Sequence, residues 1–157
     1  MSKILSFDPG KINFAYSLRE DDKVIFYGML QHYITDLSNF SAQATKLKWE
    51  ITDLLKRCDL NPDTDHAIAE RFMARPGNSR GCLNEFVNLQ IGLIASWIIP
   101  IEFHLVTAST WKNYMKRKYG TNDMLVVTKK LGMVKMVSHE ADAVGIGMWD
   151  YEKNNKK

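Results

Sequence analysis

The sequence has few of the features that mark secreted, disulfide-bonded or membrane proteins. Cys58 and Cys82 are its only cysteines, and they lack the Cys-x-x-Cys spacing of zinc and redox sites. A disulfide scaffold and a cysteine-based zinc site are therefore excluded, and reduced thiols are expected. No apolar run approaches the length of a membrane span, and no cleavable apolar segment follows Met1. These absences predict a cytoplasmic protein without membrane contact.

Length and composition indicate how many domains to expect. A chain of 157 residues with 45% hydrophobic and 25% charged residues can bury one core but is too short for two ordinary domains. No repeat or low-complexity stretch interrupts it, apart from the polar end at 152–157. We expect one domain over residues 1–151, followed by a polar, frayed tail.

Positive charge is concentrated in one part of the chain, although the net charge is only +3. Between Trp111 and Lys135, Asp123 is the only acidic residue, and the basic residues are Lys112, Lys116, Arg117, Lys118, Lys129, Lys130 and Lys135. This imbalance favours a polyanionic partner. The alternative is that these residues form the solvated face of two amphipathic helices, as most charge runs do.

Hydrophobic periodicity predicts an α/β protein with a mixed central β-sheet flanked by α-helices. Alternating apolar residues indicate strands over 3–7, 13–18, 23–30, 66–70 and 101–106. Helical spacing predicts helices over 40–58, 81–99, 109–120, 123–131 and 139–151, and Pro and Gly predict an exposed loop over 71–80. The apolar residues of 81–99 cover more than one helical face, which indicates a central helix or an oligomer interface.

Three carboxylates and an imidazole lie where apolar elements begin or end. Asp8 follows a strand-like run and precedes a Pro-Gly turn, and Glu70 ends the strand expected over 66–70. His139 and Asp142 open an apolar segment, and their i, i+3 spacing places them on one helix face. A carboxylate next to an apolar run is hard to bury without a cation or hydrogen bonds. Two strand ends and one helix could thus converge on a site for divalent metal.

Each of these residues also has an ordinary structural interpretation. Asp8, before its Pro-Gly turn, could simply cap that turn. His139 and Asp142 could be surface residues that favour the positive end of a helix. The metal hypothesis therefore depends on all of them converging with Glu70.

The segments around these positions resemble the three acidic motifs of the RuvC family of Holliday junction resolvases. They read ILSFDPG at 4–10, AIAERFMA at 67–74 and HEADAVGI at 139–146, in the family's order and over nearly the whole chain. The shortness of the chain and the segment TASTWK at 107–112 resemble the bacteriophage-type members. The chain departs from many members at His139, where they carry Asp, although other members carry His.

The resemblance implies a ribonuclease H-like fold, a homodimer and magnesium-dependent, paired nicking of a four-way DNA junction. By motif position it implies that Asp8, Glu70, His139 and Asp142 bind metal. Phosphodiester hydrolysis needs an activated water and a stabilised leaving oxygen, and two cations supply both, so we expect two Mg²⁺ ions with Asp8 between them. The neutral imidazole of His139 should increase tolerance for Mn²⁺.

Candidate DNA contacts lie after the second motif and in the basic region. They are Phe72, Arg75, Arg80, Lys112, Lys116, Arg117 and Lys118. Either Lys112 or Lys116 could neutralise the scissile phosphate, and we favour Lys112, which is therefore a candidate catalytic residue. The resemblance implies that Phe72 stacks against unstacked junction bases, and an ordinary core position is the alternative.

Other functions fit parts of the pattern. An actin-like or sugar-kinase ATP-binding fold also has an Asp after its first strand, but it needs two lobes that this length does not supply. A non-catalytic junction-binding protein would have no need of all four ligand-type residues. A broader nuclease acting on forks, flaps and three-way junctions fits nearly as well, because motifs do not encode selectivity among branched DNA structures.

Overall fold

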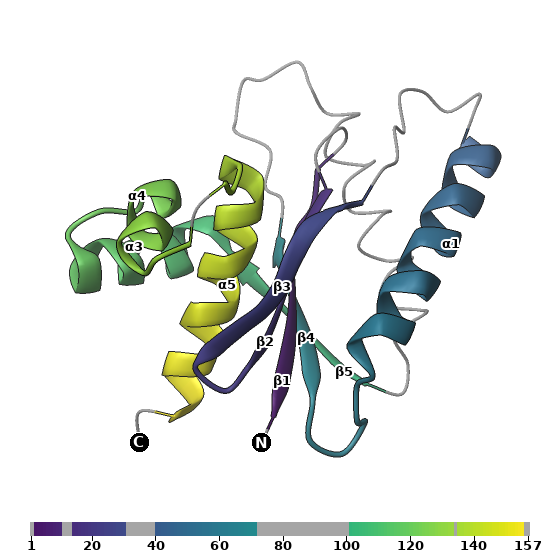
Figure 1. Ribbon diagram of the computed structural model, residues 1–157, viewed down its shortest axis with the longest axis horizontal. Coiled ribbons are helices and arrows are strands. Elements are labelled where there is room, and N and C mark those ends of the chain that lie inside the picture. The colour runs from purple at the N-terminus through teal and green to yellow at the C-terminus, as the bar shows by residue number, and fades with distance from the viewer. Residues whose placement is uncertain (1, 11–13, 31–39, 72–100, 134, 156–157) are drawn as a thin grey trace.

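The computed structural model describes residues 2–10, 14–30, 40–71, 101–133 and 135–155. In these residues a mixed sheet lies between one long helix and a group of three helices (Figure 1). The helix expected over 81–99, and nearly all of the loop expected over 71–80, lie outside the described residues. Within the described part, no helix is both long enough and apolar enough to cross a membrane.

The sheet has five strands in the order β3-β2-β1-β4-β5. They are β1 (Lys3–Asp8), β2 (Phe14–Glu20), β3 (Lys23–Leu30), β4 (His66–Arg71) and β5 (Glu102–Thr107). The first three strands pair antiparallel, as a meander, whereas β1 with β4 and β4 with β5 pair parallel. The predicted mixed sheet is confirmed, and each predicted strand lies within two residues of the observed one.

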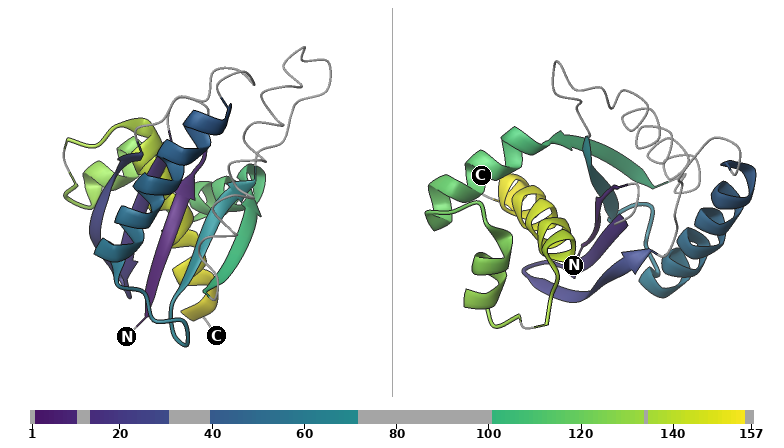
Figure 2. Two further views of the ribbon diagram at one scale, coloured as in Figure 1. Left: turned by 90° about the vertical axis from the view of Figure 1, so that its right-hand side faces the viewer. Right: turned by 90° about the horizontal axis from the view of Figure 1, so that it is seen from above.

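Helices cover both faces of the sheet, which explains why β1 is apolar along most of its length. The helices are α1 (Phe40–Cys58), α3 (Ala108–Tyr119), α4 (Met124–Lys130) and α5 (Ser138–Asn155). Leu5 and Phe7 of β1 belong to the buried cluster that includes residues of α1, whereas Ile4 belongs to the cluster with α3, α4 and α5. Figure 2 shows the sheet between α1 and these three helices.

The predicted basic helices α3 and α4 begin and end at residues suited to helix termini. The side chain of Thr107 caps α3 by accepting a hydrogen bond from the backbone N–H of Thr110. Gly120, at φ 78°, ends α3 in the left-handed conformation that glycine adopts without steric cost. The side chain of Asp123 caps α4 by accepting a hydrogen bond from the backbone N–H of Leu125. Local sequence therefore determines both helices.

Helix α5 continues past its predicted end at Tyr151. The carboxylate of Glu152 accepts hydrogen bonds from the hydroxyl of Tyr114 at 2.5 Å, from that of Tyr119 at 3.1 Å and from the ammonium of Lys118. These three partners lie on α3, and α5 extends to Asn155, so the expectation of a frayed tail over 152–157 is wrong for residues 152–155. Residues 156–157 lie outside the described residues. The polar composition of this segment gave no sign of partners so distant in sequence.

Helix α5 packs unusually close to the central strand. The hydroxyl of Ser6 in β1 donates to the backbone carbonyl of Ala143 at 2.7 Å, and the bond is buried. One turn later, a Cβ added at Gly147 would lie 2.9 Å from the Ser6 oxygen and 3.4 Å from Cδ of Arg19. The absence of a side chain at Gly147 therefore sets how near the helix can approach.

We expect Gly147→Ala to destabilise the protein by about 1–2 kcal/mol, because overpacking outweighs the gain in helix propensity of about 1 kcal/mol. Urea unfolding of the variant and the wild type measures the difference. The loss should shrink when Ser6→Ala is combined with it, because the clashing oxygen is gone. A stabilising Gly147→Ala would show that the two elements are not in tight contact.

A partly buried ion pair joins β4 to α5. The imidazole Nε2 of His66 is hydrogen-bonded to the carboxylate of Asp150, and their side chains are only 17% and 7% exposed. The hydrogen bond to Asp150 is the largest cause of a raised pKa at His66. The pair therefore stabilises the folded protein while the imidazole of His66 is protonated.

This pair predicts that stability falls as the pH rises. The stabilisation is fully present below the unfolded-state pKa of about 6.5 and is lost as the pH passes through the higher folded-state pKa of His66. Urea unfolding from about pH 6 to about pH 9 should show a decline that His66→Gln removes in part. The same slope in both proteins would contradict the assignment.

Candidate active site

Asp8 and Glu70 end neighbouring parallel strands at the same edge of the sheet. The register pairs Phe7 of β1 with Ala69 of β4, so the next residue in each strand is an acid. Parallel strands bring their carboxyl ends to one edge, which is where ligands bind in open α/β sheets. Asp8 is 8% exposed and Glu70 is half-buried, so neither carboxylate is an ordinary surface charge.

The first turns of α5 bring the other two predicted ligands to this edge. His139 Nδ1 lies within hydrogen-bond distance of Asp8 Oδ2, at 3.1 Å. Asp142 lies one turn further along the helix, immediately before the residue whose carbonyl is bonded to Ser6. The close packing of α5 on β1 therefore fixes the segment that carries both side chains.

Burial and mutual repulsion raise the pKa values of two carboxyl groups in this cluster. Burial is the largest cause at Asp142, where it and the negative charge of Asp8 raise the pKa to about 6. Burial, followed by the charge of Asp8, also raises the pKa of Glu70. The pKa of His139 is raised chiefly by its hydrogen bond with Asp8. A positive charge placed among these groups would be stabilised.

Helix α3 supplies a cation and a hydrogen-bond donor to the cluster. The positive charge of Lys112 lowers the pKa of both Glu70 and Asp142, against the effects of burial. Trp111 is fully buried, and its indole Nε1–H donates to Glu70 Oε2 at 2.8 Å. Sequence reasoning selected Lys112 but missed Trp111. The only signal was its position next to Lys112, since Glu70 is remote in sequence.

The four predicted ligands form an electrostatic cluster rather than a ready coordination shell. Among the residues that the structure describes, no group of three or more His, Cys, Asp or Glu side chains is arranged to hold a metal ion. The donor set nevertheless fits a divalent cation, because it offers anionic oxygens and one imidazole nitrogen. The raised pKa values of Glu70 and Asp142 agree, since a cation would relieve the repulsion behind them. Metal binding here stays a prediction.

Comparison with known proteins places this site on a recognised fold. No protein-family model and no curated protein sequence matches the chain. Among solved structures, a Thermus thermophilus RuvC in complex with a Holliday junction substrate matches with a TM-score of 0.74 at 14% identity, over 98% of this chain and 96% of that one. A second Thermus thermophilus RuvC structure matches with a TM-score of 0.69 at 13% identity, over 97% of this chain and 95% of that one. The yeast mitochondrial Holliday junction resolvase Ydc2 matches with a TM-score of 0.64 at 15% identity, over 99% of this chain and 82% of that one.

The chain has the RuvC fold. The match covers nearly the full length of this chain and of both Thermus thermophilus proteins, so it is not limited to a shared sheet. It confirms the ribonuclease H-like architecture predicted from the sequence. The bacteriophage-type assignment stays a prediction.

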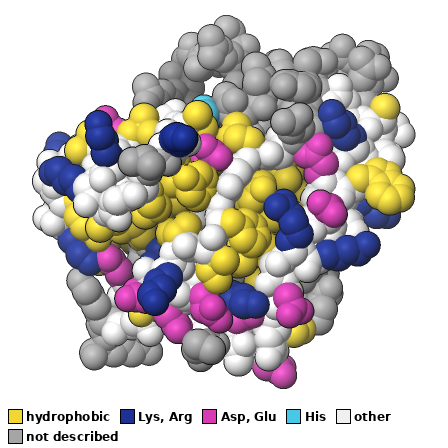
Figure 3. All heavy atoms as spheres, viewed as in Figure 1, with side chains coloured by type: hydrophobic (Ala, Val, Ile, Leu, Met, Phe, Trp, Pro, Cys, Tyr) yellow, Lys and Arg dark blue, Asp and Glu magenta, His cyan; other side chains and the backbone are white. Residues whose placement is uncertain are grey.

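In this RuvC fold, the predicted DNA contacts differ in their surroundings. Lys116 and Arg117 on α3 are exposed, whereas the ammonium of Lys118 pairs with Glu152. Figure 3 shows Lys and Arg side chains spread over the side of the molecule that carries α3 and α4. Phe72, Arg75 and Arg80 lie outside the described residues. The basic surface that the sequence predicts is thus present on α3, with one of its lysines paired internally.

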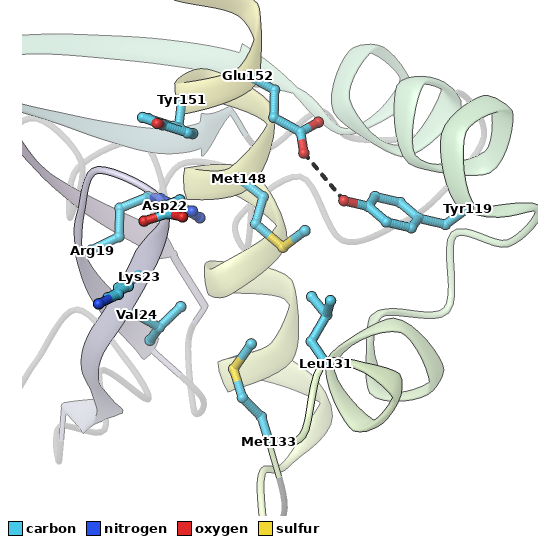
Figure 4. Close-up of a pocket in the computed structure, with 10 residues that line it drawn as sticks. All are labelled: Arg19, Asp22, Lys23, Val24, Tyr119, Leu131, Met133, Met148, Tyr151 and Glu152. Atoms are coloured by element: carbon cyan, nitrogen blue, oxygen red, sulfur yellow. Dashed lines mark hydrogen bonds between the residues drawn. The ribbon is translucent and has the colours of Figure 1, made fainter. Parts of the chain in front are cut away.

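A cavity of about 470 Å³ lies elsewhere on the RuvC fold. In Figure 4, Arg19 and Val24 of β2 and β3 lie on one side of it, Tyr119 and Leu131 lie on the other, and Met148 of α5 lies between them. None of the predicted metal ligands lines this cavity. The candidate active site is therefore the carboxylate edge of the sheet.

The electrostatic cluster predicts a measurable effect of Lys112. In the metal-free protein, Lys112→Met should raise the apparent pKa of Asp142 above its value of about 6, because a nearby positive charge is lost. Carbon-13 NMR of the side-chain carboxyl groups in EDTA follows this titration. Lys116→Met, an exposed lysine on the same helix, is the matched control. Equal effects of the two substitutions would argue against a specific position for Lys112.

Proposed function

We propose that this protein is a metal-dependent endonuclease that resolves four-way DNA junctions by nicking a pair of phosphodiester bonds. The proposal is carried by one observation, the meeting of Asp8, Glu70, His139 and Asp142 at one edge of a RuvC-fold sheet. The neighbours support the substrate class, because one is a RuvC in complex with a Holliday junction substrate and another is a Holliday junction resolvase.

The four clustered side chains would hold two Mg²⁺ ions, with Mn²⁺ as a substitute. When bound, the ions would activate a water and stabilise the charge on the leaving oxygen. Asp8 would be the central member of this ligand set, because it is the residue whose charge acts on both Glu70 and Asp142. His139 contacts Asp8 directly and keeps its carboxylate oriented. Lys112 would neutralise the scissile phosphate from α3, whose first turn lies beside the carboxylates.

DNA would be bound along the basic surface of α3. Lys116 and Arg117 are exposed and would contact phosphates, which position a duplex without reading its sequence. Phe72, Arg75 and Arg80 follow Glu70 closely along the chain and are proposed as further contacts, Phe72 by stacking. A homodimer would present two sites to two strands of one junction, as symmetric paired nicking requires.

The test uses end-labelled four-way, three-way, flap and linear DNA, incubated with the protein in magnesium or in EDTA. We expect paired, symmetric nicks in the four-way substrate that require magnesium. Asp8→Asn should lower cleavage at least about a hundredfold while it keeps junction binding, because it removes a charge needed to hold metal. Asp63→Asn, which changes an exposed aspartate in the turn before β4, should cleave like the wild type.

Two other outcomes would replace the proposal. Cleavage of every branched substrate would identify a broader nuclease of forks, flaps and three-way junctions. Tight junction binding without cleavage in any metal would identify a non-catalytic junction-binding protein. Full cleavage by Asp8→Asn would remove the carboxylate edge as the active site.

A further inference from the structure

Trp111 touches the candidate active site from a position that the proposed chemistry does not use. Its side chain has no exposed surface, and its indole N–H is bonded to Glu70 Oε2. An indole N–H can only donate, and a buried donor without an acceptor is costly. The Glu70 carboxylate is therefore held in the orientation that satisfies Trp111.

The indole is itself held in place by its own helix and by α5. Trp111 lies in the first turn of α3, the helix that Thr107 caps. A Cβ added at Gly145 of α5 would lie only 2.8 Å from the Trp111 ring. The ring thus fills the space left by a glycine three residues after Asp142, and it joins α3, α5 and the end of β4.

The face of the same ring also interacts with the ammonium group of Lys112. The ammonium of Lys112 lies 5.5 Å from the ring centre of Trp111, within the range of a cation–π interaction. One buried side chain therefore interacts with both a predicted metal ligand, Glu70, and the lysine predicted to meet the phosphate. A core residue that only filled volume would need neither contact.

We propose that Trp111 is a positioning residue that holds Glu70 in the geometry needed for metal binding. This inference rests on the proposed function, because it assumes that Glu70 is a metal ligand. Hydrogen-bond partners of metal ligands typically contribute tenfold to a hundredfold to metal affinity. Removal of the indole N–H should therefore weaken metal binding even in the absence of DNA.

The experiment compares Trp111→Phe with Trp149→Phe in the full-length protein. Both positions are buried tryptophans of the same hydrophobic cluster, but only Trp111 is among the groups that shift the pKa of Glu70. Electron paramagnetic resonance of free Mn²⁺ measures the affinity in the absence of DNA. We expect Trp111→Phe to weaken Mn²⁺ binding about tenfold and Trp149→Phe to change it less than about twofold.

A second measurement applies even if Trp111→Phe does not fold. In nitrogen-15 NMR spectra, the indole N–H resonance of Trp111 should shift in Glu70→Ala, because its acceptor is removed, while that of Trp149 stays in place. If Trp111→Phe binds Mn²⁺ as tightly as the wild type, or if the Trp111 resonance does not move, the inference is overturned. When the wild type still cleaves junctions in that case, the proposed function stands. A wild type that neither binds Mn²⁺ nor cleaves would overturn the proposed function and the inference with it.

Discussion

The contact between α5 and the central strand β1 is the constraint on which the rest of the structure depends. Gly147 leaves room for Ser6, and the Ser6 hydroxyl is bonded to the carbonyl of Ala143. A helix this close to the sheet covers its apolar face and excludes water from it. The same approach brings His139 and Asp142 to the edge where β1 ends in Asp8. Core packing and the candidate active site are therefore products of one interface.

That interface concentrates negative charge in a poorly solvated place. Asp8 is nearly buried, and its charge raises the pKa of both Glu70 and Asp142. Folding alone would not favour such crowding, since the charge of Asp8 hinders the ionisation of Glu70 and Asp142. His139 and Lys112 offset part of the repulsion from two different helices. Sites where packing sustains unfavourable electrostatics are characteristic of function rather than of stability.

Local sequence predicted most of this architecture, and the failures share a physical cause. The strands, the capped helices and the carboxylate edge follow from apolar periodicity, turn residues and strand ends, all of which act over a few positions. The bond of Trp111 to Glu70 and the bond of Tyr114 to Glu152 each join residues more than thirty positions apart. A tryptophan in an apolar pattern looks like ordinary core, and a polar chain end looks like a tail. Only the packing of α3 against α5 and β4 reveals their partners.

The hydrogen bonds of Trp111 and Glu152, which sequence reasoning missed, have a joint consequence for α3. Its first turn is fastened to β4 through Trp111 and Glu70, and its last turns are fastened to the end of α5 through Glu152. A helix anchored at both ends cannot swing as a hinge. The backbone at Lys116 and Arg117 therefore keeps a fixed position relative to the carboxylate edge at the other end of the same helix.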